Sequence, residues 1–310
     1  MAKKEKKLLD GLAKFNRVSP AANVLFSLVF ILGAICCVIP LIFIIIISFS
    51  SPQSIAEIGY SFVPKEWSLA TYQYLWSSRG VFGKAIGVSL LVTIAGTCTG
   101  ITLNGLLGYV LSRNSFKLKP FLTYMILIPM LFGGGMVASY LVNTRLLHLK
   151  DNLLVLILPL AVGSMNVIIF RTFFQTTVPE EVIESAKIDG ASQLRIFVQI
   201  VLPISLPAIA TIGLMLCFGY WNDWFTALLY IGEKDLYPLQ YFLMKMEQNI
   251  AFMKMQAQLM GGALAEIAAQ IESDTIRMGV AVVIVLPIAC AYPFFQRYFV
   301  GGLTVGAVKG

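Results

Sequence analysis

The sequence predicts an all-α integral membrane protein, and three observations predict it. Hydrophobic residues make up 58% of the 310 residues and charged residues only 13%, whereas a soluble domain carries about 25% charged residues. The apolar residues fall into runs that are long enough to cross a bilayer as helices. The basic residues gather at the ends of these runs, which argues against a nucleic-acid partner despite the net charge of +7.

Six apolar runs reach the length of about 20 residues that a membrane helix needs. We expect Pro40 and Pro129 to kink their helices without ending them, because neighbouring helices can satisfy the freed carbonyls. The three glycines at 133–135 are expected to break or bend the third run. The first run is too long for a signal peptide, so we expect an uncleaved span after a cytoplasmic tail at 1–23. The predicted spans are about 24–49, 85–111, 120–141, 152–170, 203–231 and 277–296.

The distribution of Lys and Arg predicts the orientation of these spans. With the N-terminus inside, 14 Lys and Arg residues lie on the inner side, and nine lie on an outer side that has many more residues. Both termini and the loop at 175–203 are therefore predicted to face the cytoplasm. The long outer segment 232–276 is predicted to form one or two amphipathic helices.

Cysteine and histidine give no sign of a metal or disulfide framework. All five cysteines lie inside apolar runs, where a thiol behaves as a small hydrophobic group. The only histidine, His148, has no Cys or His neighbour in the sequence with which to bind zinc. We therefore expect no catalytic residue, metal or cofactor site in this chain.

The residue pattern of the loop at 175–203 predicts two short helices that project from the membrane. Thr177 is expected to cap the first helix, with Glu180 reaching back to complete a capping box. Gly190 is expected to end that helix, because a left-handed turn residue is cheapest as Gly. Ser192 is expected to cap the second helix. The apolar stripe of the second helix comprises Ile196, Phe197, Ile200 and Val201.

The spacing of this loop resembles the EAA loop of permease subunits in ATP-binding-cassette (ABC) importers. Glu184-Ser185-Ala186 is followed after three residues by Gly190 and after nine more by Ile200-Val201-Leu202-Pro203, with Ser185 in place of the first Ala. The segment 220–224 is similar to the W-N-D/E-aromatic pattern of sugar permeases. Residues 293–310 resemble the C-terminus of maltose-type (MalG-like) permeases, and segment 64–72 resembles the branch that serves larger or complex oligosaccharides.

This resemblance implies a permease with a type I, MetI-like architecture over residues 24–310. It implies a subunit that forms half of the pathway for a sugar or oligosaccharide, in a multi-pass arrangement in the bacterial cytoplasmic membrane. The sequence has no phosphate-binding P-loop, so ATP and Mg would bind a partner ATPase and this chain would not itself be an enzyme. The implied partners are a second, different permease, an ATPase dimer, an extracellular sugar-binding protein and the lipid bilayer.

The resemblance also implies roles for particular residues. Contact with the ATPases at the C-terminus is implied for Gly306 and Lys309, on a tail that we expect to be flexible and slim and not to fold by itself. The residues implied in the substrate path are Tyr220, Trp221, Asn222, Asp223 and Trp224. The residues implied in coupling to the ATPase are Glu184, Ser185, Ala186, Asp189, Gly190, Ala191, Arg195, Leu202 and Pro203.

Several alternatives remain open from the sequence. The loop helices could lie in the membrane interface as an amphipathic hairpin. Trp221 and Trp224 could belong to an interfacial aromatic belt, and Asn104 and Asn166 could join helices to one another. The solute could be something other than a sugar. A secondary carrier would need ionisable groups deep in its spans, which are almost lacking here.

Overall fold

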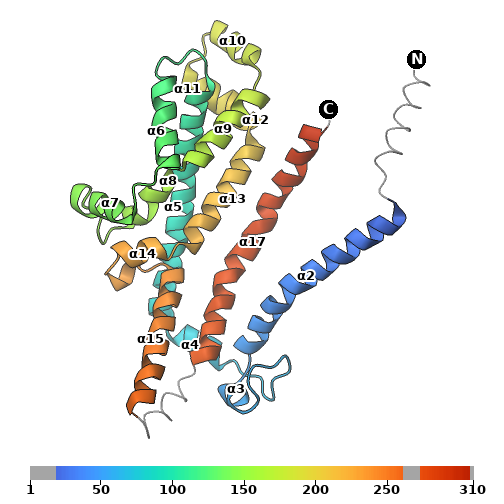
Figure 1. Ribbon diagram of the computed structural model, residues 1–310, viewed down its shortest axis with the longest axis vertical. Helices are drawn as coiled ribbons and strands as arrows, with labels where there is room; N and C mark the ends of the chain where they lie inside the picture. Colours follow the sequence, from blue (N-terminus) through green and yellow to red (C-terminus); the bar gives the residue numbers. More distant parts are fainter. Residues whose placement is uncertain (1–18, 261–272, 308–310) are drawn as a thin grey trace. The chain divides into compact units, whose positions relative to one another are not determined.

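The computed structural model describes residues 19–260 and 273–307, and the chain divides into two units, residues 1–70 and 71–310. The described residues form helices joined by short loops (Figure 1). An isolated antiparallel β-bridge joins Ser50 to Trp67, and these described residues contain no strand. The all-α prediction is therefore confirmed for the described part of the chain.

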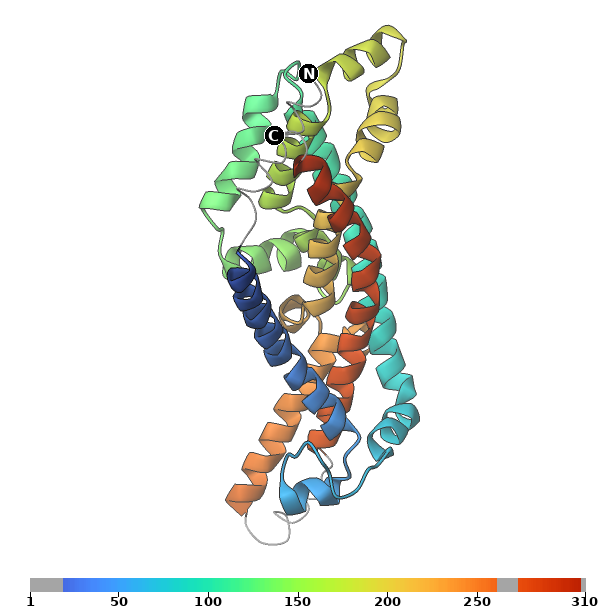
Figure 2. The same cartoon turned by 90° about the vertical axis from the view of Figure 1, so that its right-hand side faces the viewer.

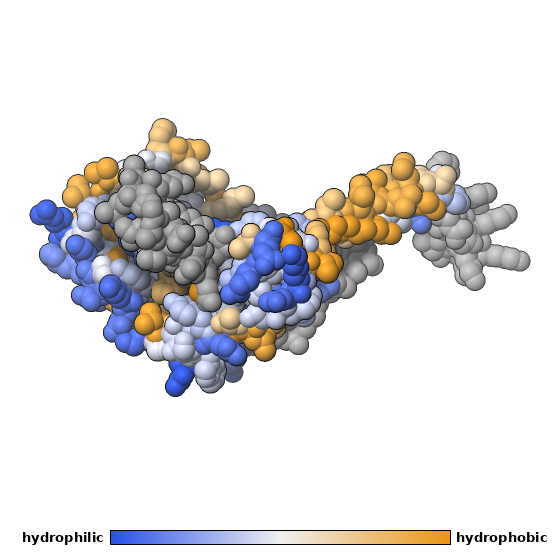
Figure 3. All heavy atoms as spheres, turned by 90° about the horizontal axis from the view of Figure 1, so that it is seen from below, coloured by the Kyte–Doolittle hydropathy of each residue, from blue (hydrophilic) through white to orange (hydrophobic). Residues whose placement is uncertain are grey.

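The first unit contains one long apolar helix, α2 (Pro20–Ser48), and one short helix, α3 (Pro52–Ile58). The side chain of Ser19 caps α2, and the helix continues through Pro40 as predicted. The hydroxyl of Ser51 caps α3 in the same way. Most side chains of α2 are exposed and apolar, so the helix presents a hydrophobic surface (orange in Figure 3).

The second unit is built around α5 (Arg79–Ser112), which at 34 residues is about 50 Å long. Helices α8, α9 and α13 pack against it, and α17 packs against α13 (Figure 1). The bounds of the other helices are α4 Ala70–Ser77, α6 Lys119–Leu131, α7 Met136–Leu141, η1 Val142–Leu146, α8 Leu153–Ala161, α9 Ser164–Thr177, α10 Glu180–Ile188, α11 Gln193–Ile196, η2 Phe197–Val201, α12 Leu202–Ile204, α13 Leu206–Asn222, α14 Phe225–Tyr230, η3 Lys234–Leu236, α15 Leu239–Met260 and α17 Ser273–Ala307.

Glycines along one face of α5 allow the neighbouring helices to approach closely. A Cβ at Gly96 would lie 2.5 Å from the ring of Tyr220, and one at Gly108 would lie 2.6 Å from Cβ of Phe170. Small residues four apart let helix backbones come together in this way. This face of α5 therefore fixes the positions of α9 and α13.

Three helices are long and apolar enough to cross a membrane singly, at 20–48, 79–112 and 275–293. Three further apolar stretches are pairs of helices with a sharp bend between them. The bends are 119° between Leu131 and Met136, 48° between Ala161 and Ser164, and 84° at Ser205. The predicted break at the glycines 133–135 is confirmed, and Gly135 has a positive φ of 79°.

The expectation of one continuous helix over 203–231 is wrong. α12 ends at Ile204, α13 ends at Asn222, and α14 begins only at Phe225. Asp223 is extended, with ψ of 102°, and its Oδ1 accepts a hydrogen bond from the amide of Thr226 at 3.1 Å. An Asp side chain that satisfies a free amide at a helix start offers the backbone an alternative to a continuous helix.

The segment 232–276 contains helix α15, so a helix is present there as predicted, and residues 261–272 lie outside the described residues. The C-terminal expectation needs correction, because α17 continues from Ser273 through Ala307 and does not give way to a non-helical tail after 300. Pro287 and Pro293 lie inside this helix without ending it. The formation of a continuous apolar helix outweighs the low helix propensity of the glycines near its end.

Candidate functional site

Helices α10 and α11 form a hairpin that projects at one end of the second unit (Figure 2). Gly190 turns the chain between them with a φ of +78°. Its amide donates to the carbonyl of Lys187 at 3.0 Å, and the amide of Ala191 donates to the carbonyl of Ala186 at 3.0 Å. These two bonds make a Schellman motif, in which a left-handed residue closes the helix. The prediction that Gly190 ends the first helix is confirmed.

The hydroxyl of Ser192 caps α11 by accepting a hydrogen bond from the amide of Arg195 at 3.3 Å, as predicted. The predicted capping box of α10 is wrong. Thr177 is the last residue of α9, and the residue that precedes α10 is Pro179. Because Thr177 still belongs to α9 and Glu180 is the first residue of α10, neither residue holds the position that a capping box requires.

The inner face of the hairpin is apolar and joins the main hydrophobic core. Ile183 is fully buried, and Ala186 is 9% exposed. Ala186 is among the residues implied in coupling, but its methyl group packs into the protein's own core. The predicted stripe of the second helix is also inward: Ile196, Phe197 and Val201 are buried, and Ile200 packs against them.

The outer face carries charges and two large apolar side chains. Glu184, Ser185, Asp189, Gly190 and Arg195 are all exposed, so most of the predicted coupling residues are accessible to a partner. Ala191 and Leu202 are partly buried, and Pro203 is exposed. The predicted coupling residues did not include Ile188 and Leu194, whose side chains are 86% and 66% exposed. Both are apolar residues that lie outside the buried stripe of their helices. An apolar residue at such a position is a feature of the sequence by which they could have been identified.

The residues predicted for the substrate path do not point to one place. Tyr220 is buried and its hydroxyl donates to the carbonyl of Ile157 at 2.8 Å. Trp221 is buried and its Nε1 donates to the carbonyl of Ile284 in α17 at 3.1 Å. Both side chains therefore hold helices together in this structure.

The remaining three residues of that segment are at least partly accessible. The amide oxygen of Asn222 accepts a hydrogen bond from Nε2 of Gln240 at 3.1 Å, and both side chains are wholly or partly exposed. Trp224 is 41% exposed, and Asp223 is half-buried. Of the two C-terminal candidates, Gly306 lies in α17, and Lys309 lies outside the described residues.

Within residues 19–260 and 273–307, no group of three or more His, Cys, Asp or Glu side chains could hold a metal ion. The five cysteines are free thiols, and four of them are exposed on the apolar helices.

Comparison with known proteins gives the family. Residues 96–305 match the family described as the inner membrane component of binding-protein-dependent transport systems. Two Bacillus subtilis proteins are similar over nearly their whole lengths. The polygalacturonan/rhamnogalacturonan transport system permease protein YtcP is 38% identical, covering 89% of this chain and 94% of its own, and the protein LplC is 36% identical, covering 96% and 97%.

Two more distant matches are a curated sequence and a solved structure. The arabinooligosaccharides transport system permease protein AraQ of Halalkalibacterium halodurans is 25% identical over 95% of this chain and 99% of its own. A chain from the crystal structure of a bacterial ABC transporter involved in the import of alginate superposes with a TM-score of 0.78 at 24% identity, covering 91% of this chain and 99% of its own. This chain therefore belongs to the family of inner membrane components of binding-protein-dependent transport systems.

Proposed function

We propose that this chain is the permease subunit of an ATP-driven ABC importer for a sugar or oligosaccharide. It forms half of the transmembrane pathway and couples to a separate ATPase through the hairpin α10–α11. The observation that carries the proposal is this hairpin. In a member of a transport family this hairpin exposes Glu184, Ser185, Asp189 and Arg195, while its buried apolar side chains pack into the hydrophobic core.

The proposed topology has six spans with both termini in the cytoplasm of a bacterial cell. The three single helices and the three bent pairs together supply six apolar stretches. Large apolar side chains on α2 are exposed, including Phe30 at 75% and Leu32 at 65%. A soluble monomer rarely exposes apolar patches of more than a few hundred Å², so lipid or another membrane subunit is the environment that suits this surface.

The proposed substrate class is an oligosaccharide, and the names of the similar proteins support it. They are described as transporting polygalacturonan or rhamnogalacturonan, arabino-oligosaccharides and alginate. On this chain we assign Asn222, Asp223 and Trp224 as the accessible part of the sugar path, with Tyr220 and Trp221 supporting them from behind.

The proposed assembly contains a second, different permease, an ATPase dimer and an extracellular sugar-binding protein. ATP and Mg bind the ATPases, and this chain carries neither a cofactor nor a catalytic residue. Gly190 and Leu202-Pro203 shape the coupling hairpin, and Gly306 and Lys309 extend toward the ATPases. Import follows from alternating access, in which closure of the ATPases moves the two permeases against each other.

Co-purification and uptake test this function. The full-length chain is expected to purify with a second permease and an ATPase, and to support ATP-dependent uptake of labelled polygalacturonan fragments in the presence of the binding protein. Glu184→Lys is expected to reduce the amount of retained ATPase, because it reverses a charge on the docking face. Glu66→Lys makes the same change in an exposed side chain on the side proposed to be outside and is expected to have no effect. Uptake by the chain alone, without an ATPase, would refute the proposal.

A further inference from the structure

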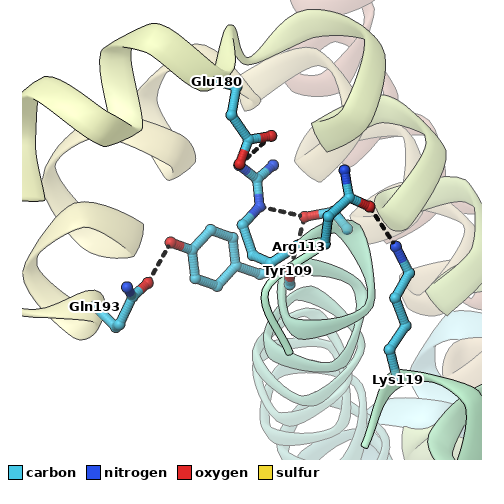
Figure 4. A network of polar contacts seen from close by, with 7 residues as sticks. Tyr109, Arg113, Lys119, Glu180 and Gln193 are labelled. Carbon is cyan, nitrogen blue, oxygen red and sulfur yellow. Dashed lines mark hydrogen bonds and ion pairs between the residues drawn. The ribbon is translucent and has the colours of Figure 1, made fainter. Parts of the chain in front are cut away.

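Tyr109 in the last turn of α5 and Arg113, the residue directly after α5, each contact the first residue of one hairpin helix (Figure 4). The hydroxyl of Tyr109 donates a hydrogen bond to Oε1 of Gln193, the first residue of α11, at 3.0 Å. Nη1 of Arg113 lies 3.8 Å from Oε2 of Glu180, the first residue of α10. The two side chains also contact each other, because the guanidinium of Arg113 lies over the ring of Tyr109.

Both side chains are held firmly on the side of α5. The ring of Tyr109 is buried and packs against Phe174 and Phe197, with ring centroids 6.4 Å and 5.1 Å away. The guanidinium of Arg113 lies over the Tyr109 ring at 5.4 Å, and its Nε donates to Oγ of Ser112 at 2.9 Å. The two contacts with the hairpin therefore start from a rigid base.

Arg113 and Glu180 differ in exposure, and the distance between their charged groups is long for an ion pair. The side chain of Arg113 is 7% exposed, whereas that of Glu180 is 50% exposed. A charge-assisted hydrogen bond of this kind is about 2.7–2.9 Å long, so the pair at 3.8 Å is not fully closed. Nη1 of Arg113 is buried and has no hydrogen-bond partner among the described residues.

A cavity of about 420 Å³ lies beside this pair. It is lined by the end of α5, the end of α9 and the start of α10, including Arg113, Gln175 and Glu180. The cavity therefore leaves room for α10 to shift relative to α5. The buried guanidinium of Arg113 favours positions of α10 that keep the carboxylate of Glu180 close to it.

We propose that Tyr109 and Arg113 are positioning residues that make the hairpin α10–α11 follow the movement of α5. Tyr109 controls the start of α11 and Arg113 controls the start of α10, so one turn of a membrane helix sets the angle of both. The inference rests on the proposed function for its consequence in transport. The contacts themselves belong to this chain alone.

Hydrogen exchange in the purified full-length chain, with whatever subunits accompany it, tests the contacts. Glu180→Gln is expected to speed amide exchange in residues 181–188 by roughly tenfold, because it leaves the buried guanidinium of Arg113 without its counter-charge. Arg113→Gln is expected to speed this exchange by roughly two- to fivefold, because the carboxylate of Glu180 that it leaves behind is half exposed to water. The double variant is expected to exchange no faster than either single variant. Glu181→Gln is the matched control: it removes a neighbouring carboxylate that makes no ion pair with any described residue, and exchange should stay at the wild-type rate. Unchanged exchange in the Arg113 and Glu180 variants would overturn the proposal.

A second measurement separates positioning from simple stabilisation. In proteoliposomes that contain the complex and its binding protein, Arg113→Gln is expected to lower the amount of labelled polygalacturonan fragment moved per ATP hydrolysed. The exchanged pair Arg113→Glu with Glu180→Arg should recover part of this ratio. If exchange quickens but the ratio stays at the wild-type value, the residues only stabilise the hairpin and the positioning role is refuted. A wild-type preparation without any ATPase would instead overturn the proposed function, and the transport role of the pair with it.

Discussion

Oδ1 of Asn104 accepts a hydrogen bond from the backbone amide of Gly163 at 3.0 Å. Nδ2 of the same side chain donates to the carbonyl of Ala161 at 2.7 Å and to the carbonyl of Gly100 at 2.6 Å. Asn104 is fully buried, and Ala161 and Gly163 flank the break between α8 and α9. Backbone groups freed by a break in an apolar environment need partners. One amide from α5 supplies a partner to each side of this break.

We therefore expect Asn104→Leu to destabilise the second unit. The change leaves the carbonyl of Ala161 and the amide of Gly163 without these partners, at a cost of about 1–3 kcal/mol. The midpoint of thermal unfolding in detergent is the measurement. Asn166→Leu is the matched control, since Asn166 is a partly buried Asn in α9 whose side chain makes no hydrogen bond within the described structure. An equal loss of stability in both variants would contradict this role for Asn104.

The close packing on α5 leads to a second prediction. A methyl group at Gly108 would lie 2.6 Å from Cβ of Phe170 and 3.0 Å from the backbone N of Arg171, so Gly108→Ala forces α5 and α9 apart. Overpacking of this kind costs about 1–3 kcal/mol. Gly87→Ala makes the same change in the same helix, where no atom lies within 4 Å. Thermal unfolding should show a lower midpoint for Gly108→Ala and no loss for Gly87→Ala.

Local sequence signals predicted the hairpin better than they predicted the membrane helices. Gly190 and Ser192 act within four residues of themselves, so their turn and cap followed from residue type alone. The capping box at Thr177 failed because Pro179 takes the position before the helix and has no amide to bond. A correct prediction of the helix start needed the effect of Pro179 to be weighed against the favourable spacing of Thr177 and Glu180.

Longer-range contacts explain most of what the sequence did not predict. Tyr109 and Gln193 are 84 residues apart, and Asn104 and Gly163 are 59 residues apart. Neither pairing has a signature within one apolar run. The small residues spaced by four along α5, at 96, 100 and 108 with Asn104 between them, were visible in the sequence and indicate a packed face. The break at Asp223 differs from these pairings, because the hydrogen bond between its side chain and the amide of Thr226 spans only three residues.

Asp151 leads to a pH prediction. It joins the start of the fourth apolar stretch to the loop after α14, accepting hydrogen bonds from the amides of Gly232 and Glu233, the latter at 3.2 Å. The hydrogen bond from Gly232, with smaller help from Glu233 and the charge of Lys150, lowers the pKa of Asp151 below its usual value. The lowered pKa means that the carboxylate stabilises the folded state above the unfolded pKa of about 3.9, and that this stability is lost as the pH falls through the folded pKa.

Unfolding midpoints measured between about pH 5 and pH 2 test this prediction. Wild-type protein should lose stability with acid more steeply than Asp151→Asn, because the amide still accepts hydrogen bonds and does not titrate. Parallel pH profiles for the two proteins would show that the Asp151 carboxylate plays no such part.

Gly190 makes the sharpest test of the hairpin as a coupling element. A side chain at its φ of +78° is strained by about 1–2 kcal/mol, yet no atom lies within 4 Å of the place a Cβ would occupy. Gly190→Val therefore distorts the turn without a clash elsewhere, and the membrane helices should insert normally. We expect less ATPase to co-purify, or less labelled oligosaccharide to be moved per ATP. Gly190→Asn, which tolerates the left-handed conformation, should restore most of both quantities, and Gly87→Val should affect neither. Wild-type uptake by Gly190→Val would mean that the shape of this turn does not matter for coupling.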